Sequence, residues 1–130
     1  MTLLELRDVT KEFIVDGGFV RELLGRKRTV TAVEEVTFSI EPGETFGIVG
    51  ESGAGKSTIA NLVTQLHIPT SGTIVFDGVD TDYYLSESMK EFRQAVQMVF
   101  QTPSGSIDPR YRVGDWVEES LIVHTDMNET

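Results

Sequence analysis

The segment GESGAGKST, from Gly50 to Thr58, holds the residues of this chain whose types and spacing best suit chemistry. It fits the phosphate-loop pattern G-x-x-x-x-G-K-[ST], with Gly50, Gly55, Lys56 and Ser57 at the fixed positions. Glycines allow backbone N–H groups to turn inward around a polyphosphate, where a Cβ would clash. The lysine can then reach the terminal phosphates, and the serine hydroxyl suits a bridging Mg²⁺. The segment therefore predicts a site for nucleotide phosphates.

The surroundings of this loop favour a phosphate site over a chance glycine-rich turn. Residues 44–49 read as a short apolar strand that enters the loop. The apolar residues after the loop recur at helical spacing, up to a stop near Pro69, and are Ile59, Ala60, Leu62, Val63 and Leu66. We expect the whole loop to contact the nucleotide, with Ser57 also as a metal ligand: Gly50, Glu51, Ser52, Gly53, Ala54, Gly55, Lys56, Ser57 and Thr58.

Composition excludes several other classes of protein. The 130 residues are 39% hydrophobic and contain no cysteine, which excludes a disulfide framework and a thiolate zinc site. A net charge of -10 argues against a nucleic-acid partner, because phosphate backbones are bound through clustered Lys and Arg. No apolar run is long enough for a membrane span, and the first residues lack a secretion signal. We therefore expect one globular domain in the cytosol.

The first half of the chain carries strand patterns on both sides of the loop. Residues 4–9 and 36–40 alternate apolar and polar side chains, which predicts an antiparallel pair. Residues 16–28 contain three glycines and read as an insertion at the tip of that pair. Residues 73–76, followed by Asp77-Gly78, predict a further strand and turn.

The second half predicts two helices around a buried strand. Ser88 with Glu91 three residues later has the form of a capping box, which indicates a short helix. Residues 95–100 read as a buried strand that ends at Gln101. Residues 112–124 place apolar side chains near one helical face.

Several separate segments resemble the nucleotide-binding subunits of ABC transporters, and more narrowly those of the oligopeptide, dipeptide and nickel importer group. Residues 10–13 (TKEF) resemble the A-loop, and residues 41–44 (EPGE) resemble the usual lead into the phosphate loop. The loop itself, with Glu51-Ser52 after its first glycine, is similar to the peptide-importer variant. Residues 99–101 (VFQ) resemble the Q-loop, and residues 106–115 are similar to the stretch beyond it in peptide importers.

This resemblance implies an α/β fold with a P-loop NTPase-like core and an N-terminal antiparallel β subdomain, incomplete at the C-terminus. It divides the chain into an antiparallel β region at 1–45 with the insertion, a phosphate-loop core at 46–100, and the Q-loop with the start of a helical subdomain at 101–130. The family's LSGGQ signature, Walker B Asp, catalytic Glu and switch His do not occur before Thr130. The chain therefore resembles the N-terminal half of such a domain.

The resemblance also implies further nucleotide contacts. Phe13 stands where the family usually has a Tyr that stacks on adenine, and Val33 is a further expected contact. Gln101 would complete the magnesium shell and sense the γ-phosphate. From the residues alone, Phe13 as a core aromatic and Gln101 as a buried amide at a strand end stay open. Trp116 is expected to be a core anchor, and His67 an ordinary surface histidine.

The function implied is the ATP-binding part of an ATPase subunit that powers import of peptides or a similar solute. Its cofactors would be ATP and Mg²⁺, and its partners the transmembrane permease subunits and a second nucleotide-binding subunit, on the cytoplasmic face of the membrane. Tyr111, Arg110 and Arg112 are expected on the surface that docks the permease. Alone, the chain is expected to bind ATP without hydrolysing it. A non-catalytic truncated nucleotide-binding or interaction module stays open as an alternative. A GTPase or small-molecule kinase is a third possibility, and the resemblance to the A-loop and the Q-loop argues against it.

Overall fold

The computed structural model describes residues 1–15, 28–102, 108 and 110–125. Nearly all of the predicted insertion at 16–28 therefore lies outside the described residues. The chain divides after Ser88 into two compact units, and each is described by itself. The predicted division of the chain at residues 45 and 100 stays a prediction.

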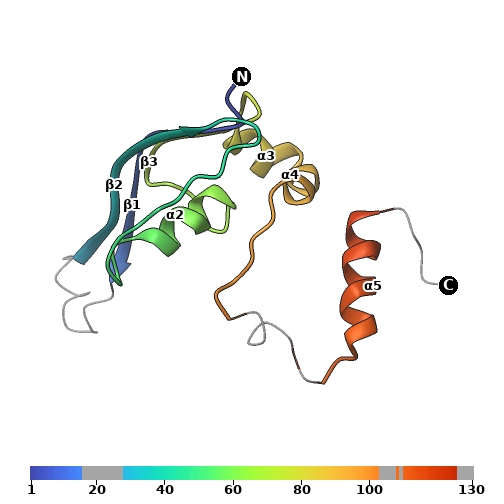
Figure 1. Cartoon of the computed structure of the whole chain (residues 1–130). Helices are drawn as coiled ribbons and strands as arrows, with labels where there is room; N and C mark the ends of the chain where they lie inside the picture. Colours follow the sequence, from blue (N-terminus) through green and yellow to red (C-terminus); the bar gives the residue numbers. More distant parts are fainter. Residues whose placement is uncertain (16–27, 103–107, 109, 126–130) are drawn as a thin grey trace. The chain divides into compact units, whose positions relative to one another are not determined.

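The first unit is built on an antiparallel sheet with the strand order β2-β1-β3-β4. The predicted pair is confirmed and is longer than expected, because β1 (Leu4–Val15) runs antiparallel to β2 (Arg28–Ile40) along most of both strands. On its other edge β1 pairs with β3 (Ser71–Phe76), which turns into the short β4 (Val79–Asp80). Figure 1 shows β1, β2 and β3 side by side.

A tight turn joins β3 to β4. Its central residues, Asp77 and Gly78, have φ of 49° and 77°. Both positive angles fit the Asp-Gly turn of a β-hairpin, whose twist matches that of the flanking strands. The strand and turn predicted at this point are therefore confirmed.

One face of the sheet packs against α2 (Lys56–Val63), the helix that follows the phosphate loop. The cluster of buried side chains that joins them consists of Leu4, Leu6, Val9, Val33, Ile59, Leu62 and Ile74. Burying a side chain of this size stabilises the fold by about 1.5–3 kcal/mol. The phosphate loop therefore lies between the sheet and α2, which the buried cluster holds together.

The phosphate-loop helix is shorter than predicted. After Val63 the Thr64 hydroxyl donates to the Ala60 carbonyl at 2.9 Å, and Gln65 adopts φ of 56°. A left-handed residue ends an α-helix, so Leu66 lies beyond the helix and is 46% exposed. The expectation that the helix includes Leu66 and continues to near Pro69 was wrong.

Helix α3 (Thr81–Glu87) was not predicted. It begins at Asp80, whose carboxylate accepts a hydrogen bond from the Asp82 backbone N–H at 2.9 Å, as an N-cap residue does. The buried Gln65 side chain donates to the Thr81 hydroxyl at 3.0 Å and so ties the end of α2 to the start of α3.

The strands predicted at 44–49 and 95–100 do not form, which corrects both expectations. Residues 44–49 run as coil, and Val49 is 96% exposed; Val99, in the second segment, is 87% exposed. A buried strand needs neighbours that satisfy its backbone N–H and C=O groups, and no strand in the described part of the chain pairs with either segment. Phe46 nevertheless packs on the sheet, since its ring stacks on that of Phe38 with the two centroids 4.6 Å apart.

The second unit contains both helices predicted for it, α4 (Met89–Ala95) and α5 (Val113–His124). The Arg112 backbone N–H donates to the Asp115 carboxylate at 3.2 Å at the start of α5, and the Gln94 amide donates to the His124 carbonyl at its end. None of the described residues of α5 is buried. No helix in the described ranges is long and apolar enough to span a bilayer.

Candidate nucleotide-binding site

Two glycines give the phosphate loop its curvature. Gly53 and Gly55 have φ of 84° and 85°, in the left-handed region that glycine adopts without strain. A Cβ at Gly55 would lie 2.4 Å from the Ala32 carbonyl oxygen, whereas one at Gly53 would meet nothing within 4 Å. Gly55 is therefore required by the close approach of β2, and Gly53 by its backbone angle alone.

The Lys56 side chain folds back over the loop. Its Nζ donates to the Gly50 carbonyl at 2.6 Å and to the Glu51 carbonyl at 2.5 Å. The Ala54 N–H closes the curve by donating to the same Glu51 carbonyl at 3.2 Å. Because an ammonium carries three donors, the side chain can still donate to an anion that enters the loop.

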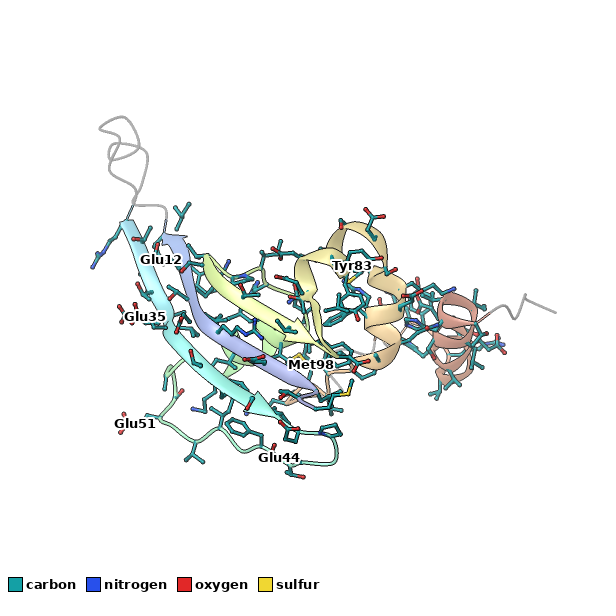
Figure 2. The ribbon with its side chains drawn as sticks, turned by 90° about the horizontal axis from the view of Figure 1, so that it is seen from above. Glu12, Glu35, Glu44, Glu51, Tyr83 and Met98 are labelled. Atoms are coloured by element: carbon teal, nitrogen blue, oxygen red, sulfur yellow. The ribbon has the colours of Figure 1, made fainter. Side chains whose placement is uncertain are left out.

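The start of α2 adds backbone donors and a favourable field. Gly55 is its N-cap, and the Ile59 N–H donates to the Gly55 carbonyl at 2.9 Å. The N–H groups of the helix start that precede Ile59 have no intrahelical partner, and the helix dipole there favours negative charge. The first turn contains no acidic residue. In Figure 2 the Glu51 side chain, the loop's one acid, points away from the sheet.

These features fit a magnesium-bound polyphosphate. The loop offers bare glycine backbone, a positioned ammonium and free N–H donors, which are the groups that bind phosphate oxygens. Ser57 is exposed beside Lys56, so its hydroxyl is accessible to a metal ion that bridges two phosphates.

Val33 lies beside the phosphate loop, and Phe13 lies further along the same pair of strands. Val33 is 5% exposed, and its Cγ2 lies 3.3 Å from the position of a Cβ on Gly55, so it supports the loop from β2. Phe13 is half-buried on β1, opposite Val30. Its ring centroid lies 5.2 Å from that of His67 at an interplanar angle of 75°. Their contacts with a nucleotide stay predictions.

Sequence reasoning missed the residues that surround Phe13. The Lys11 Nζ lies 5.2 Å from the Phe13 ring centroid and donates to the Ile68 carbonyl at 2.7 Å. Contacts between β1 and the segment after α2 join residues more than fifty positions apart, so no local pattern could reveal them.

A family model described as ABC transporter matches residues 33–129. This chain belongs to the ABC transporter family. The Dipeptide transport ATP-binding protein DppF of Escherichia coli (strain K12) is 38% identical over 127 residues, which cover 98% of this chain and 37% of that protein. The Oligopeptide transport ATP-binding protein AppF of Bacillus subtilis (strain 168) is 43% identical over 124 residues, 95% of this chain and 37% of that protein. The resemblance predicted from the motifs is confirmed.

Solved ABC cassettes confirm the predicted fold class. The ATP-binding cassette MJ0796, in a dimeric post-hydrolysis state bound to ADP and Pi, matches with a TM-score of 0.78 and 28% identity. The match covers 98% of this chain and 50% of that one. This member of the ABC family therefore spans half of the solved cassette and little more than a third of the curated relatives.

The second unit holds the remaining predicted residues. Gln101 is exposed, and no strand ends at it, so the alternative of a buried amide at a strand end was wrong. Its approach to Ser57, which lies in the first unit, stays a prediction. Trp116 is 36% exposed, and its ring centroid lies 6.3 Å from that of Tyr111. In the described part of the chain it is therefore not the buried core residue that the sequence predicted.

A hollow of about 630 Å³ opens beside these two aromatic rings in the second unit. Its lining combines aromatic, apolar and acidic side chains: Asp108, Tyr111, Asp115, Trp116, Glu118, Glu119 and Ile122. Arg110 donates to the Asp108 carboxylate at 2.6 Å, and this hydrogen bond lowers the pKa of Asp108. The Arg110 side chain is nevertheless 85% exposed, and an exposed ion pair is weak, so the expectation that Arg110 meets a partner stays a prediction.

Proposed function

We propose that this chain binds Mg-ATP as part of the ATP-binding subunit of a peptide importer, and that the full subunit couples ATP binding and hydrolysis to import. The observation that carries the proposal is the geometry of the loop, with Gly55 seated against β2 and the Lys56 ammonium held over the loop carbonyls. The names of its relatives, which are peptide transport ATP-binding proteins, support the choice of solute class.

In this proposal each part of the site has a separate task. The backbone N–H groups of Gly53 and of residues 55–58, together with the Lys56 ammonium, bind and orient the phosphates. Ser57 and Gln101 hold Mg²⁺, while Phe13 and Val33 contact the base and its sugar. Bound Mg-ATP supplies the phosphoanhydride bond whose cleavage the complete subunit uses.

The isolated chain is expected to bind ATP without turning it over. Phosphoryl transfer to water needs a group that orients the attacking water, and we assign that role to no residue of this chain. Phosphate release at high protein concentration should therefore equal the buffer background. Turnover that survives purification and disappears in Lys56→Ala would contradict this, and Glu118 and Glu119 would be the first residues to replace.

We further propose that the full subunit lies at the cytoplasmic face of the membrane, with a second nucleotide-binding subunit and the permease. The solved cassette MJ0796 is a dimer, which supports the first partner. The hollow beside Tyr111 and Trp116 supports the second, because a lining of aromatic, apolar and acidic side chains suits an apolar anchor flanked by basic groups.

Tyr111→Ala in the full-length subunit should weaken assembly with the permease. The ring is 61% exposed and lines the hollow, so its loss removes apolar contact area while leaving the phosphate loop intact. We expect at least a roughly fivefold loss of copurified permease and of ATP-driven transport, with unchanged ATP affinity. Tyr83→Ala, an exposed tyrosine on α3, is the matched control. Normal assembly and transport by Tyr111→Ala would exclude this surface.

A further inference from the structure

We propose that His67 is a positioning residue of the nucleotide site, which holds the Phe13 ring in the orientation that receives the adenine base. The proposal rests on the proposed function, because it needs ATP in the loop and Phe13 at its base. It departs from the sequence-based expectation that His67 is an ordinary surface histidine.

The Phe13 ring is contacted from two directions. The centroid of the His67 ring lies 5.2 Å from that of Phe13, and the two ring planes meet at 75°. This is the edge-to-face arrangement that aromatic pairs prefer. The Lys11 Nζ lies 5.2 Å from its centroid. Phe13 is only half-buried, so part of the ring surface remains open to a ligand. A ring with fixed neighbours and an open surface can stack on a flat base without first losing rotational freedom.

The backbone that carries His67 is fastened to both of its neighbours. Its N–H donates to the Asn61 carbonyl of α2 at 3.0 Å. The residues that follow are tied to β1, since Lys11 Nζ donates to the Ile68 carbonyl at 2.7 Å and the Glu12 N–H donates to the Thr70 hydroxyl at 3.0 Å. The His67 ring therefore has a fixed base from which to orient Phe13.

Residues that are neighbours in the sheet lead from this pair to the phosphate loop. The Val33 Cγ2 lies 3.3 Å from the position that a Cβ on Gly55 would take, and Val33 stands opposite Lys11 in the register of β1 and β2. Lys11 and Phe13 are two residues apart on one strand, so they share a face about 7 Å apart. Phosphates in the loop and a base at Phe13 therefore lie along one face of the first unit.

The test separates base binding from phosphate binding, with the full chain as the sample. The affinities of Mg-ATP and of inorganic triphosphate with Mg²⁺ are measured for two variants. His67→Leu keeps a side chain of similar size but loses the ring, whereas His67→Phe keeps an aromatic ring. We expect His67→Leu to weaken ATP roughly fivefold and to leave triphosphate unchanged. His67→Phe should retain the affinity for ATP.

Each other result has a distinct meaning. Equal losses for ATP and triphosphate in His67→Leu would show a merely structural role and overturn the inference, as would an unchanged affinity for ATP. Phe13→Ala and Lys56→Ala decide whether the proposed function itself holds: the first should weaken ATP only, and the second should weaken both ligands. If both of those variants bind ATP normally, the proposed function fails. If His67→Leu does not fold, His67→Asn provides the same comparison.

Discussion

Replacing Lys56 with alanine is expected to remove most of the stabilisation that Mg-ATP gives to the chain. The Lys56 ammonium is held at the Gly50 and Glu51 carbonyls and supplies the loop's one side-chain positive charge. At a ligand concentration of about 100 Kd, binding stabilises a folded chain by ~2.7 kcal/mol. At roughly 4 °C for each kcal/mol, the melting temperature of the original chain should rise by about 10 °C.

The measurement is the difference in melting temperature with and without Mg-ATP, taken separately for each variant. This difference matters because Lys56→Ala also removes hydrogen bonds to the loop and lowers the melting temperature of the free protein. Lys90→Ala, on the exposed side of α4, removes the same charge outside the loop and should keep the full shift. Equal shifts in Lys56→Ala and the original chain would disprove phosphate binding at this loop.

The same assay decides between nucleotides. If ATP and GTP stabilise the chain equally at equal concentration, base recognition at Phe13 does not select adenine, and the GTPase alternative gains support. A larger shift with ATP that is lost in Phe13→Ala would support the stacking role proposed for that ring. Omission of Mg²⁺ should reduce the shift, because the metal ion proposed beside Ser57 would neutralise phosphate charge.

Sequence patterns predicted the parts of this fold that depend on neighbouring residues. The phosphate loop, the alternation in β1 and β2, and the Asp77-Gly78 turn each carry their structural reason within a few positions. Their success follows from chemistry that is local: glycine angles, side-chain alternation and turn preferences. The contacts of the site with a nucleotide remain predictions, because they depend on the ligand as well as on the chain.

The errors in prediction occur where a structure depends on distant partners or on one backbone angle. Residues 44–49 and 95–100 have apolar strand composition, but a strand forms only where another backbone accepts its hydrogen bonds. The end of α2 depends on the left-handed Gln65, which helical spacing does not indicate. His67 and Phe13 come into contact only when the sheet and α2 pack together, so no local sequence pattern indicates this pair.

Alanine at Gly55 is expected to damage the chain far more than alanine at Gly53. The two glycines have φ of 85° and 84°, so the backbone strain of the two substitutions is matched. That strain costs about 1–2 kcal/mol in the left-handed region. Only at Gly55 does the new Cβ also approach the Ala32 carbonyl oxygen to 2.4 Å, far inside van der Waals contact.

The collision at Gly55 can be relieved only by movement of the loop away from β2, because the contacting atom is backbone. Such a movement breaks the packing of Val33 on the loop, so we expect Gly55→Ala to lose about 3 kcal/mol or more of unfolding free energy. Gly53→Ala should lose only about 1–2 kcal/mol, the backbone strain alone. Urea unfolding without nucleotide measures both values, and the Mg-ATP shift of each folded variant then reports on the loop. Equal losses in the two variants would show that contact with β2 does not hold the phosphate loop in place.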